Sequence, residues 1–322
     1  MSNYKVIFFV LLLLPVFFQT VKSQAALSQS ELENLLRKAE NQSQNYVKVF
    51  KNLSAEETKT KFRYRRDGGL DEKRIIKSIF VVYQSANTDY AQEFRNVVEF
   101  NGKNVSRNDD ETVVFFEKLS KANTTGEEFE KIRKESLRFD GNRISWGMTL
   151  YQPRPFSENL KANFKFQTVG KEQIEGRDVW IIEYEQTKPS PYILSNPTDK
   201  EDQTTGTTQY NMPISDAFRP TNPLIKGKIW LDAETGQVWR NQFKVILHPT
   251  KLNRPIEAAE LSYEYQSSAF GILAPKKFII RTYQIKGSGD KNLTVTKDAE
   301  ITYEYVKFSE FKTETKEYRI KN

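Results

Sequence analysis

The chain has 322 residues, a formal net charge of +7, one histidine and no cysteine. This length allows a sizeable core in one or two domains. The lack of cysteine excludes disulfides, thiolate metal sites and a lipid attached to cysteine, and a single histidine argues against a histidine-based metal site. The charges are interspersed along the chain, so a solvated surface is favoured over nucleic-acid binding.

The first 25 residues have the pattern of a secretory signal peptide. Lys5 precedes an apolar run from Val6 to Phe18, and small residues allow cleavage after Ser23 or after Ala25. The apolar run is short for a transmembrane helix. We therefore expect segment 1–25 to be removed and the mature chain not to be an integral membrane protein.

A helix is predicted from about residue 28 to about residue 51. Ser28 and Ser30 are each followed three residues later by a glutamate, which is capping-box spacing. Apolar residues then recur at helical spacing: Leu32, Leu35, Leu36, Ala39, Tyr46, Val47 and Phe50. Two compatible interpretations remain for this stripe: it packs on a sheet, or it plugs or covers a ligand cavity.

The next part of the chain combines strands with a pair of helices. A polar strand is expected near 58–66, and apolar strands are expected at 75–83 and 94–100, with Asn101-Gly102 as a hairpin turn. Residues 111–121 and 126–138 predict two short helices. Further strands are expected near 164–168 and 180–184, with a turn at 175–178 between them.

The most regular stretch is 225–247, which predicts a β-hairpin. Apolar residues alternate with polar ones on both sides of the segment 232–236, which begins with Asp232 and ends with Gly236. Period-2 patterning of this kind is typical of an antiparallel strand with one buried face. Three more strands are predicted at about 256–266, 276–285 and 297–307.

Together these elements predict a mainly β (α+β) fold: a strongly curved antiparallel sheet or half-barrel of about ten strands, covered by the N-terminal helix and the central helical pair. We expect one domain over 26–311. Segment 187–223, rich in Pro, Thr, Asn and Ser, is predicted to be a long mobile surface loop. Segment 312–322 is a charged tail expected to fray.

The segments 176–185 (GRDVWIIEYE) and 227–240 (GKIWLDAETGQVWR) resemble the outer-membrane lipoprotein-carrier superfamily, which includes the LolA and LolB carriers and the RseB sensor. The mature chain is similar to a group of uncharacterised secreted bacterial proteins of that fold, through segments 94–103 and 135–139. The resemblance implies a half-barrel closed by helices, a hydrophobic cavity, a location in the periplasm or at the outer-membrane periphery of a Gram-negative-type bacterium, and no enzymatic activity.

Seven residues are the candidate lining of such a cavity, because alternation places them on one face of the sheet: Trp180, Ile182, Tyr184, Ile229, Leu231, Phe243 and Val245. A close-packed core is the other interpretation of the same stripe. No nucleophile elbow, phosphate loop or metal-ligand cluster is present in the sequence, so no catalytic, metal-binding or cofactor-binding residue is predicted and no cofactor is expected.

Two functions remain open from the sequence. The first is a secreted periplasmic or envelope protein that holds a lipid, an acyl chain or a lipoprotein segment in an apolar cavity between the sheet and the helices. The alternative is an envelope interaction or sensor module of the same fold, with a fully packed interior and a protein partner. A hydrolase, which would need a cleft with coupled carboxylates, is less favoured.

Overall fold

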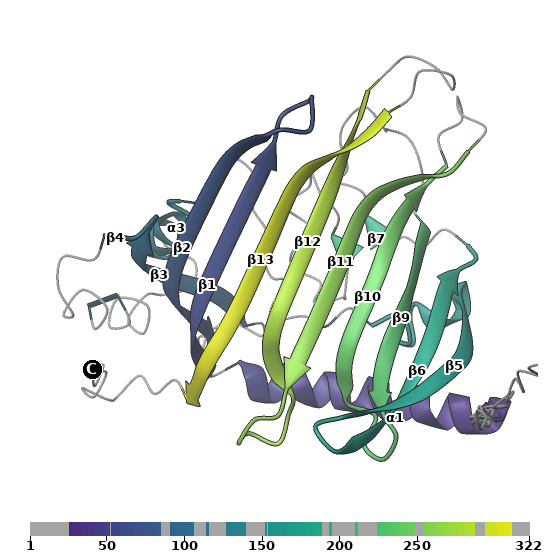
Figure 1. The fold of residues 1–322 in the computed structure, drawn as a ribbon. Coiled ribbons are helices and arrows are strands. Elements are labelled where there is room, and N and C mark those ends of the chain that lie inside the picture. The colour runs from purple at the N-terminus through teal and green to yellow at the C-terminus, as the bar shows by residue number, and fades with distance from the viewer. Residues whose placement is uncertain are drawn as a thin grey trace, which may run out of the picture.

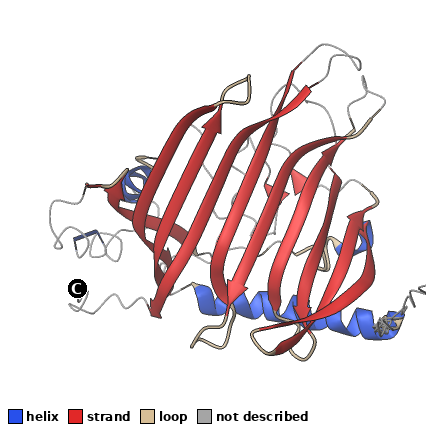
Figure 2. Ribbon diagram, viewed as in Figure 1, coloured by secondary structure: helices blue, strands red, loops and turns tan. Residues whose placement is uncertain are grey.

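The computed structural model describes residues 26–51, 53–84, 91–105, 114–115, 127–139, 152, 154–188, 193–194, 210–211, 224–248, 254–286 and 294–310. An open, curved 11-stranded sheet dominates these residues, and one long helix crosses one of its faces (Figure 1, Figure 2). The predicted signal peptide and the tail 312–322 lie outside the described residues. Among the described residues, no helix combines the length and apolar character needed to cross a membrane.

All strand pairs of the main sheet are antiparallel. Its strands are β1 (Leu53–Tyr64), β2 (Leu70–Tyr83), β3 (Gln92–Phe100), β4 (Lys103–Asn104), β5 (Phe164–Ile174), β6 (Arg177–Gln186), β9 (Leu224–Asp232), β10 (Val238–Leu247), β11 (Ile256–Gln266), β12 (Ala274–Lys286) and β13 (Thr294–Glu310). The predicted mainly β fold with a curved antiparallel sheet is confirmed.

The spatial order of the strands is β4-β3-β2-β1-β13-β12-β11-β10-β9-β6-β5. The chain therefore builds one edge with β1 to β4 and then crosses to the opposite edge at β5. It returns strand by strand until β13 pairs with β1, where Lys59 lies opposite Tyr303. The first and last strands of the sheet are thus neighbours in its middle (Figure 1).

Helix α1 (Gln29–Phe50) is capped at its N-terminus by Ser28, which forms the predicted capping box with Glu31. Its buried stripe follows helical spacing and consists of Leu32, Leu35, Ala39, Ser43, Tyr46 and Phe50. This stripe packs on the sheet: the ring of Phe50 lies 6.3 Å from that of Phe80 in β2, and Tyr46 lies 6.2 Å from Tyr265 in β11. We call the face of the sheet that α1 covers the inner face.

The main core lies between α1 and the inner face, and it draws residues from both halves of the sheet. The opposite, outer face carries cross-strand ion pairs. Lys277 pairs with Glu304 at 3.0 Å and Arg281 pairs with Glu300 at 2.9 Å. This division into a buried and a wet face explains why strand alternation was visible in the sequence.

The second helix of the predicted pair corresponds to α3 (Glu127–Ser136). Its Ile132 packs with Val81 and Phe94, which point away from the inner face, so α3 covers the β3 edge rather than the space beside α1. Of the predicted helix 111–121, residues 114 and 115 are helical, and the remainder lies outside the described residues.

The predicted loop 187–223 contains two short strands that the sequence did not indicate. β7 (Ile193–Leu194) and β8 (Tyr210–Asn211) pair in parallel as a separate two-stranded sheet. The mobility of segment 187–223 stays a prediction. Most of the remaining segment lies outside the described residues.

Candidate functional site

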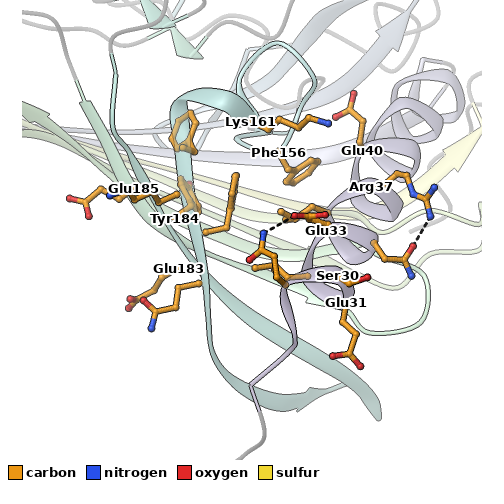
Figure 3. Close-up of a pocket in the computed structure, with 18 of the residues that line it drawn as sticks. Ser30, Glu31, Glu33, Arg37, Glu40, Phe156, Lys161, Glu183, Tyr184 and Glu185 are labelled. Carbon is orange, nitrogen blue, oxygen red and sulfur yellow. Dashed lines mark hydrogen bonds between the residues drawn. The ribbon is translucent and has the colours of Figure 1, made fainter.

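A pocket of about 1310 Å³ opens between the N-terminal half of α1, the segment 156–161 and the sheet edge formed by β5 and β6 (Figure 3). Its lining combines apolar side chains with charged ones. The apolar contributors are Leu32, Leu36, Phe156, Phe164, Phe166 and Tyr184. This volume exceeds the ~300–1,000 Å³ usual for small-molecule sites, so the pocket has room for a long ligand.

The helical wall of the pocket comes from the N-terminal half of α1, between Gln29 and Glu40. Gln29, Glu33, Leu36 and Glu40 recur at spacings of four, three and four residues, which places them on the same side of the helix. They lie next to the buried stripe that holds α1 on the sheet. The apolar stripe of the predicted helix therefore packs on the sheet, and its second interpretation, as a plug or cover of a ligand cavity, stays a prediction.

The sheet wall is aromatic. Phe164 and Phe166 are alternate residues of the edge strand β5, and both face Tyr184 of β6, with ring centroids 5.8 and 6.4 Å away. The Tyr184 hydroxyl donates a hydrogen bond of 2.7 Å to Oδ1 of Asn241 in β10, which fixes the ring. Phe156, fully buried, points toward the same space (Figure 3).

The seven predicted cavity residues share the inner face. Cross-strand pairing places Trp180 opposite Leu231 and Ile182 opposite Ile229. Tyr184 and Phe243 both lie opposite Gly227 of β9, one on each side of it. Six of the seven are buried in the main core, and Trp180 packs partly buried against it. Tyr184 is the one that also lines the pocket. Ligand contact by the other residues, Trp180, Ile182, Ile229, Leu231, Phe243 and Val245, stays a prediction.

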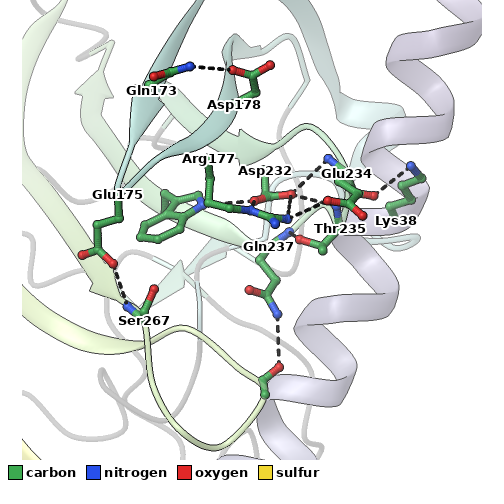
Figure 4. Close-up of polar contacts among 12 residues, drawn as sticks. Lys38, Gln173, Glu175, Arg177, Asp178, Asp232, Glu234, Thr235, Gln237 and Ser267 are labelled. Carbon is green, nitrogen blue, oxygen red and sulfur yellow. Dashed lines mark hydrogen bonds and ion pairs between the residues drawn. The ribbon is translucent and has the colours of Figure 1, made fainter.

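The turn between β9 and β10 sets the position of α1. Gly236 has φ +78°, and a Cβ placed on it would lie 2.7 Å from the backbone nitrogen of Ala39. Lys38 Nζ donates to the Glu234 carbonyl oxygen at 2.9 Å (Figure 4). The predicted hairpin turn therefore contacts the helix directly, and its glycine permits both the left-handed backbone and the close approach.

Asp232 organises this turn. Its Oδ1 accepts hydrogen bonds from the backbone nitrogens of Glu234 and Thr235 at 3.0 and 2.8 Å, and Arg177 of β6 donates to both carboxylate oxygens at 2.9 and 3.1 Å (Figure 4). Burial raises the pKa of Asp232, but the hydrogen bonds from Arg177 and from Thr235 outweigh it and lower the pKa to about 2.

A second polar group lies at the other end of the inner face. Arg95 of β3 donates to both oxygens of Glu57 in β1 at 2.8–3.0 Å and to Glu93 at 3.2 Å, and all three side chains are buried. The guanidinium also lies 5.0 Å from the ring centroid of Phe80. This cluster was not predicted from the sequence, because single Glu and Arg residues in strands normally indicate a solvated face.

Among the residues that the structure describes, no three His, Cys, Asp or Glu residues are grouped closely enough to hold a metal ion. The pocket lining combines apolar side chains with charged groups at its border. Such a site can bind and orient an amphiphilic molecule.

Neither protein-family models nor curated proteins match this chain. Solved structures with a similar fold include a protein domain named for outer membrane lipoprotein sorting from Vibrio parahaemolyticus, with 9% identity, coverage of 88% of this chain and 94% of that chain, and a TM-score of 0.32. A DUF1329 family protein from Desulfovibrio piger shares 10% identity, with coverage of 87% and 93% and a TM-score of 0.32.

A LolA superfamily protein from Nitrosomonas europaea is also similar, with 10% identity, coverage of 86% of this chain and 92% of that chain, and a TM-score of 0.28. At TM-scores of 0.28 to 0.32, these three likenesses carry no argument about family or function.

Proposed function

We propose that this protein is a binding protein of the bacterial cell envelope that holds an acyl chain in the pocket between α1 and the β5–β6 edge. The ligand is a lipid, a free acyl chain or the acylated segment of a lipoprotein. The observation that carries the proposal is the 1310 Å³ pocket with its wall of aliphatic and aromatic side chains. Binding of this kind needs no catalytic group.

The energetics of acyl-chain binding fit an apolar wall of this type. Each buried methylene contributes about 0.8 kcal/mol, so a chain of moderate length gains several kcal/mol without a single hydrogen bond. The aromatic rings of Phe156, Phe164 and Phe166 supply large contact areas with few rotatable bonds. Tyr184 is held by Asn241, so that part of the wall is formed before the ligand arrives.

The proposed location rests on the amino-terminal segment. The apolar run that follows Lys5 and the small residues before position 26 support export from the cytoplasm. An envelope protein that binds lipid would meet acyl chains there, both in membranes and on acylated proteins. The predicted partners are accordingly a lipid, an acyl chain or lipoprotein, and an envelope protein that delivers or receives it.

The test is native mass spectrometry of the chain after export and purification without detergent, followed by solvent extraction. We expect an adduct in the mass range of a fatty acid or phospholipid. Leu36→Glu places a carboxylate on the α1 wall and should abolish the adduct. Leu70→Glu, the same change at a leucine that is 49% exposed and distant from the pocket, should retain it.

The proposal fails if the protein stays free of adduct after incubation with phospholipid vesicles and free fatty acid. It also fails if the adduct survives in Leu36→Glu while that variant remains folded by circular dichroism. A clean apo protein would leave the interaction module as the better account of the fold.

A further inference from the structure

Strand β5 forms one edge of the main sheet. It pairs with β6 on one side, and among the residues that the structure describes no strand lies on its other side (Figure 1). The strand is 11 residues long, and Lys165, Gln167 and Val169 are exposed along it. Val169 is a large apolar side chain with an exposed fraction of 42%. An edge strand of this length offers its backbone N–H and C=O groups to any strand that can align with it.

A β-bulge in β5 brings two opposite charges to the same face of the sheet. The pairing with β6 shifts by one residue after Thr168. Lys165 lies before the shift, opposite Glu185, and Glu172 lies after it, opposite Val179. The two β6 residues are an even number of positions apart in a regular strand, so they share the outer face, and Lys165 and Glu172 share it with them. Without the bulge these two charges would point to opposite faces.

This arrangement makes the β5 edge complementary to itself. An antiparallel pairing of β5 with β5 of a second copy that sets Lys165 opposite Glu172 aligns residues 164–173 of each copy, which is nearly the whole strand. Two-fold symmetry repeats the charge contact on the other side of the axis. At the axis, Thr168 and Val169 of one copy lie opposite Val169 and Thr168 of the other. The exposed valine is therefore covered by the same register that pairs the charges.

The same features disfavour other partners for this edge. Lysines and a bulge on an edge strand ordinarily discourage pairing with unrelated strands. A register that set Lys165 opposite Lys165 would also be unfavourable, because like charges would face each other. Among the described residues Lys165 has no ion-pair partner. Glu172 is 40% exposed, and its nearest cation, Arg240 Nη1, lies 3.7 Å away, beyond hydrogen-bond distance.

We propose that the protein forms a two-fold symmetric dimer through β5, in which the two sheets join into one and Lys165 of each copy pairs with Glu172 of the other. This inference concerns assembly and stands whether or not the pocket binds an acyl chain. Phe166 of β5 lines the pocket, and on the inner face the same register sets Lys171 of the second copy opposite it. Each pocket therefore borders the interface, with a cation of the other copy beside its aromatic wall.

The test is sedimentation velocity of the whole protein over about three decades of concentration, where we expect a reversible monomer–dimer equilibrium. Lys165→Glu and Glu172→Lys each set like charges opposite one another at both symmetric contacts, and each should weaken dimerisation about tenfold. The double variant Lys165→Glu with Glu172→Lys restores opposite charges and should dimerise like the unaltered protein. The control Lys103→Glu makes the same charge change at an exposed residue of β4, on the opposite edge, and should have no effect.

A protein that stays monomeric across the series overturns the proposal. A dimer that both single variants leave unchanged forms through another surface and also overturns it, as does a double variant that dimerises no better than the single ones. Hydrogen exchange adds a readout on the unaltered protein that needs no variant. The backbone amides of β5 should exchange more slowly as the protein concentration rises, and exchange independent of concentration would contradict pairing at this edge.

Discussion

Gly236 and Ala39 meet at the point where the β9–β10 hairpin supports α1. The two residues are so close that a Cβ on Gly236 would lie 2.7 Å from the Ala39 nitrogen, and Ala39 is fully buried. The pocket lies along the same helix, on the flank that carries Leu36 and Glu40. The position of the turn therefore sets how far the α1 flank stands from the β5–β6 edge.

Gly236→Ala should destabilise the fold more than an ordinary glycine substitution in a turn. The new side chain adopts a strained left-handed backbone, at about 1–2 kcal/mol, and it also pushes against the α1 backbone, at about 1–3 kcal/mol more. The control is Gly176→Ala, whose glycine has φ +77° but no atom within 4 Å of the added Cβ. Urea unfolding measures both variants, and equal losses would contradict the helix contact.

The charge of Asp232 should make stability depend on pH in a defined window. Its pKa is about 2 in the folded protein against 3.8 without the fold, so the stabilisation is fully present above about pH 4. It is lost as the pH falls through that interval toward 2. At neutral pH it amounts to about 2 kcal/mol.

Asp232→Asn isolates this charge, because an asparagine oxygen still accepts the turn hydrogen bonds from Glu234 and Thr235. We expect the variant to be less stable than the unaltered protein at pH 6, and the gap between them to narrow by about 1 kcal/mol at pH 3. Urea unfolding at the two pH values measures this. A constant gap would show that the Asp232 charge contributes nothing to the fold.

Much of the sheet could be predicted because one of its faces is buried and the other is exposed to solvent. In the halves of β9 and β10 away from the turn, buried and exposed positions alternate, and Asp232 and Gly236 carry the predicted turn roles. In β1 the inner positions Glu57, Lys59 and Lys61 are charged yet buried, so the alternation is hidden. The strand starts at Leu53, earlier than the predicted start near residue 58. Ionic pairing replaces apolar contact there, and no period-2 rule detects it.

The pocket was harder to predict than the fold. Alternation identifies which residues of a strand face inward, but it does not reveal where a space opens between a helix and the sheet. Leu36 and Glu40 look like ordinary flanking residues of an amphipathic helix. Their role arises from contacts distant in sequence, such as the approach of Gly236 to Ala39. Tyr184 combines both signals, since it is an inner-face residue of a predicted strand and lies at the open edge.

Tyr184→Phe should separate stability from ligand binding. The change removes a hydroxyl that donates to Asn241 at 2.7 Å in a buried setting, at a cost of about 1–2 kcal/mol. The aromatic ring stays, so the pocket keeps its apolar wall. We expect a lower midpoint in thermal unfolding together with an unchanged lipid adduct in native mass spectrometry. Loss of the adduct at a temperature where the variant is folded would show that the hydroxyl contacts the ligand.

Removing one partner of the buried Arg95–Glu57 pair should lower the free energy of unfolding more than replacing both partners by apolar residues. Arg95→Met leaves Glu57 and Glu93 without their guanidinium partner, and we expect a loss of about 3–5 kcal/mol. In the double variant Glu57→Met with Arg95→Met, the buried Glu57 carboxylate is removed together with its guanidinium partner, so the loss should be clearly smaller than in Arg95→Met alone.

The outer-face pair Lys277–Glu304 is the matched control for this cycle. Its side chains are 36% and 50% exposed, so Lys277→Met should cost less than about 1 kcal/mol. Urea unfolding of the four proteins, namely the unaltered chain, the two single variants Arg95→Met and Lys277→Met, and the double variant, gives the comparison. A loss for Arg95→Met as small as that for Lys277→Met would mean that water reaches the cluster. The β1–β3 end of the inner face would then be a wet surface rather than part of the core.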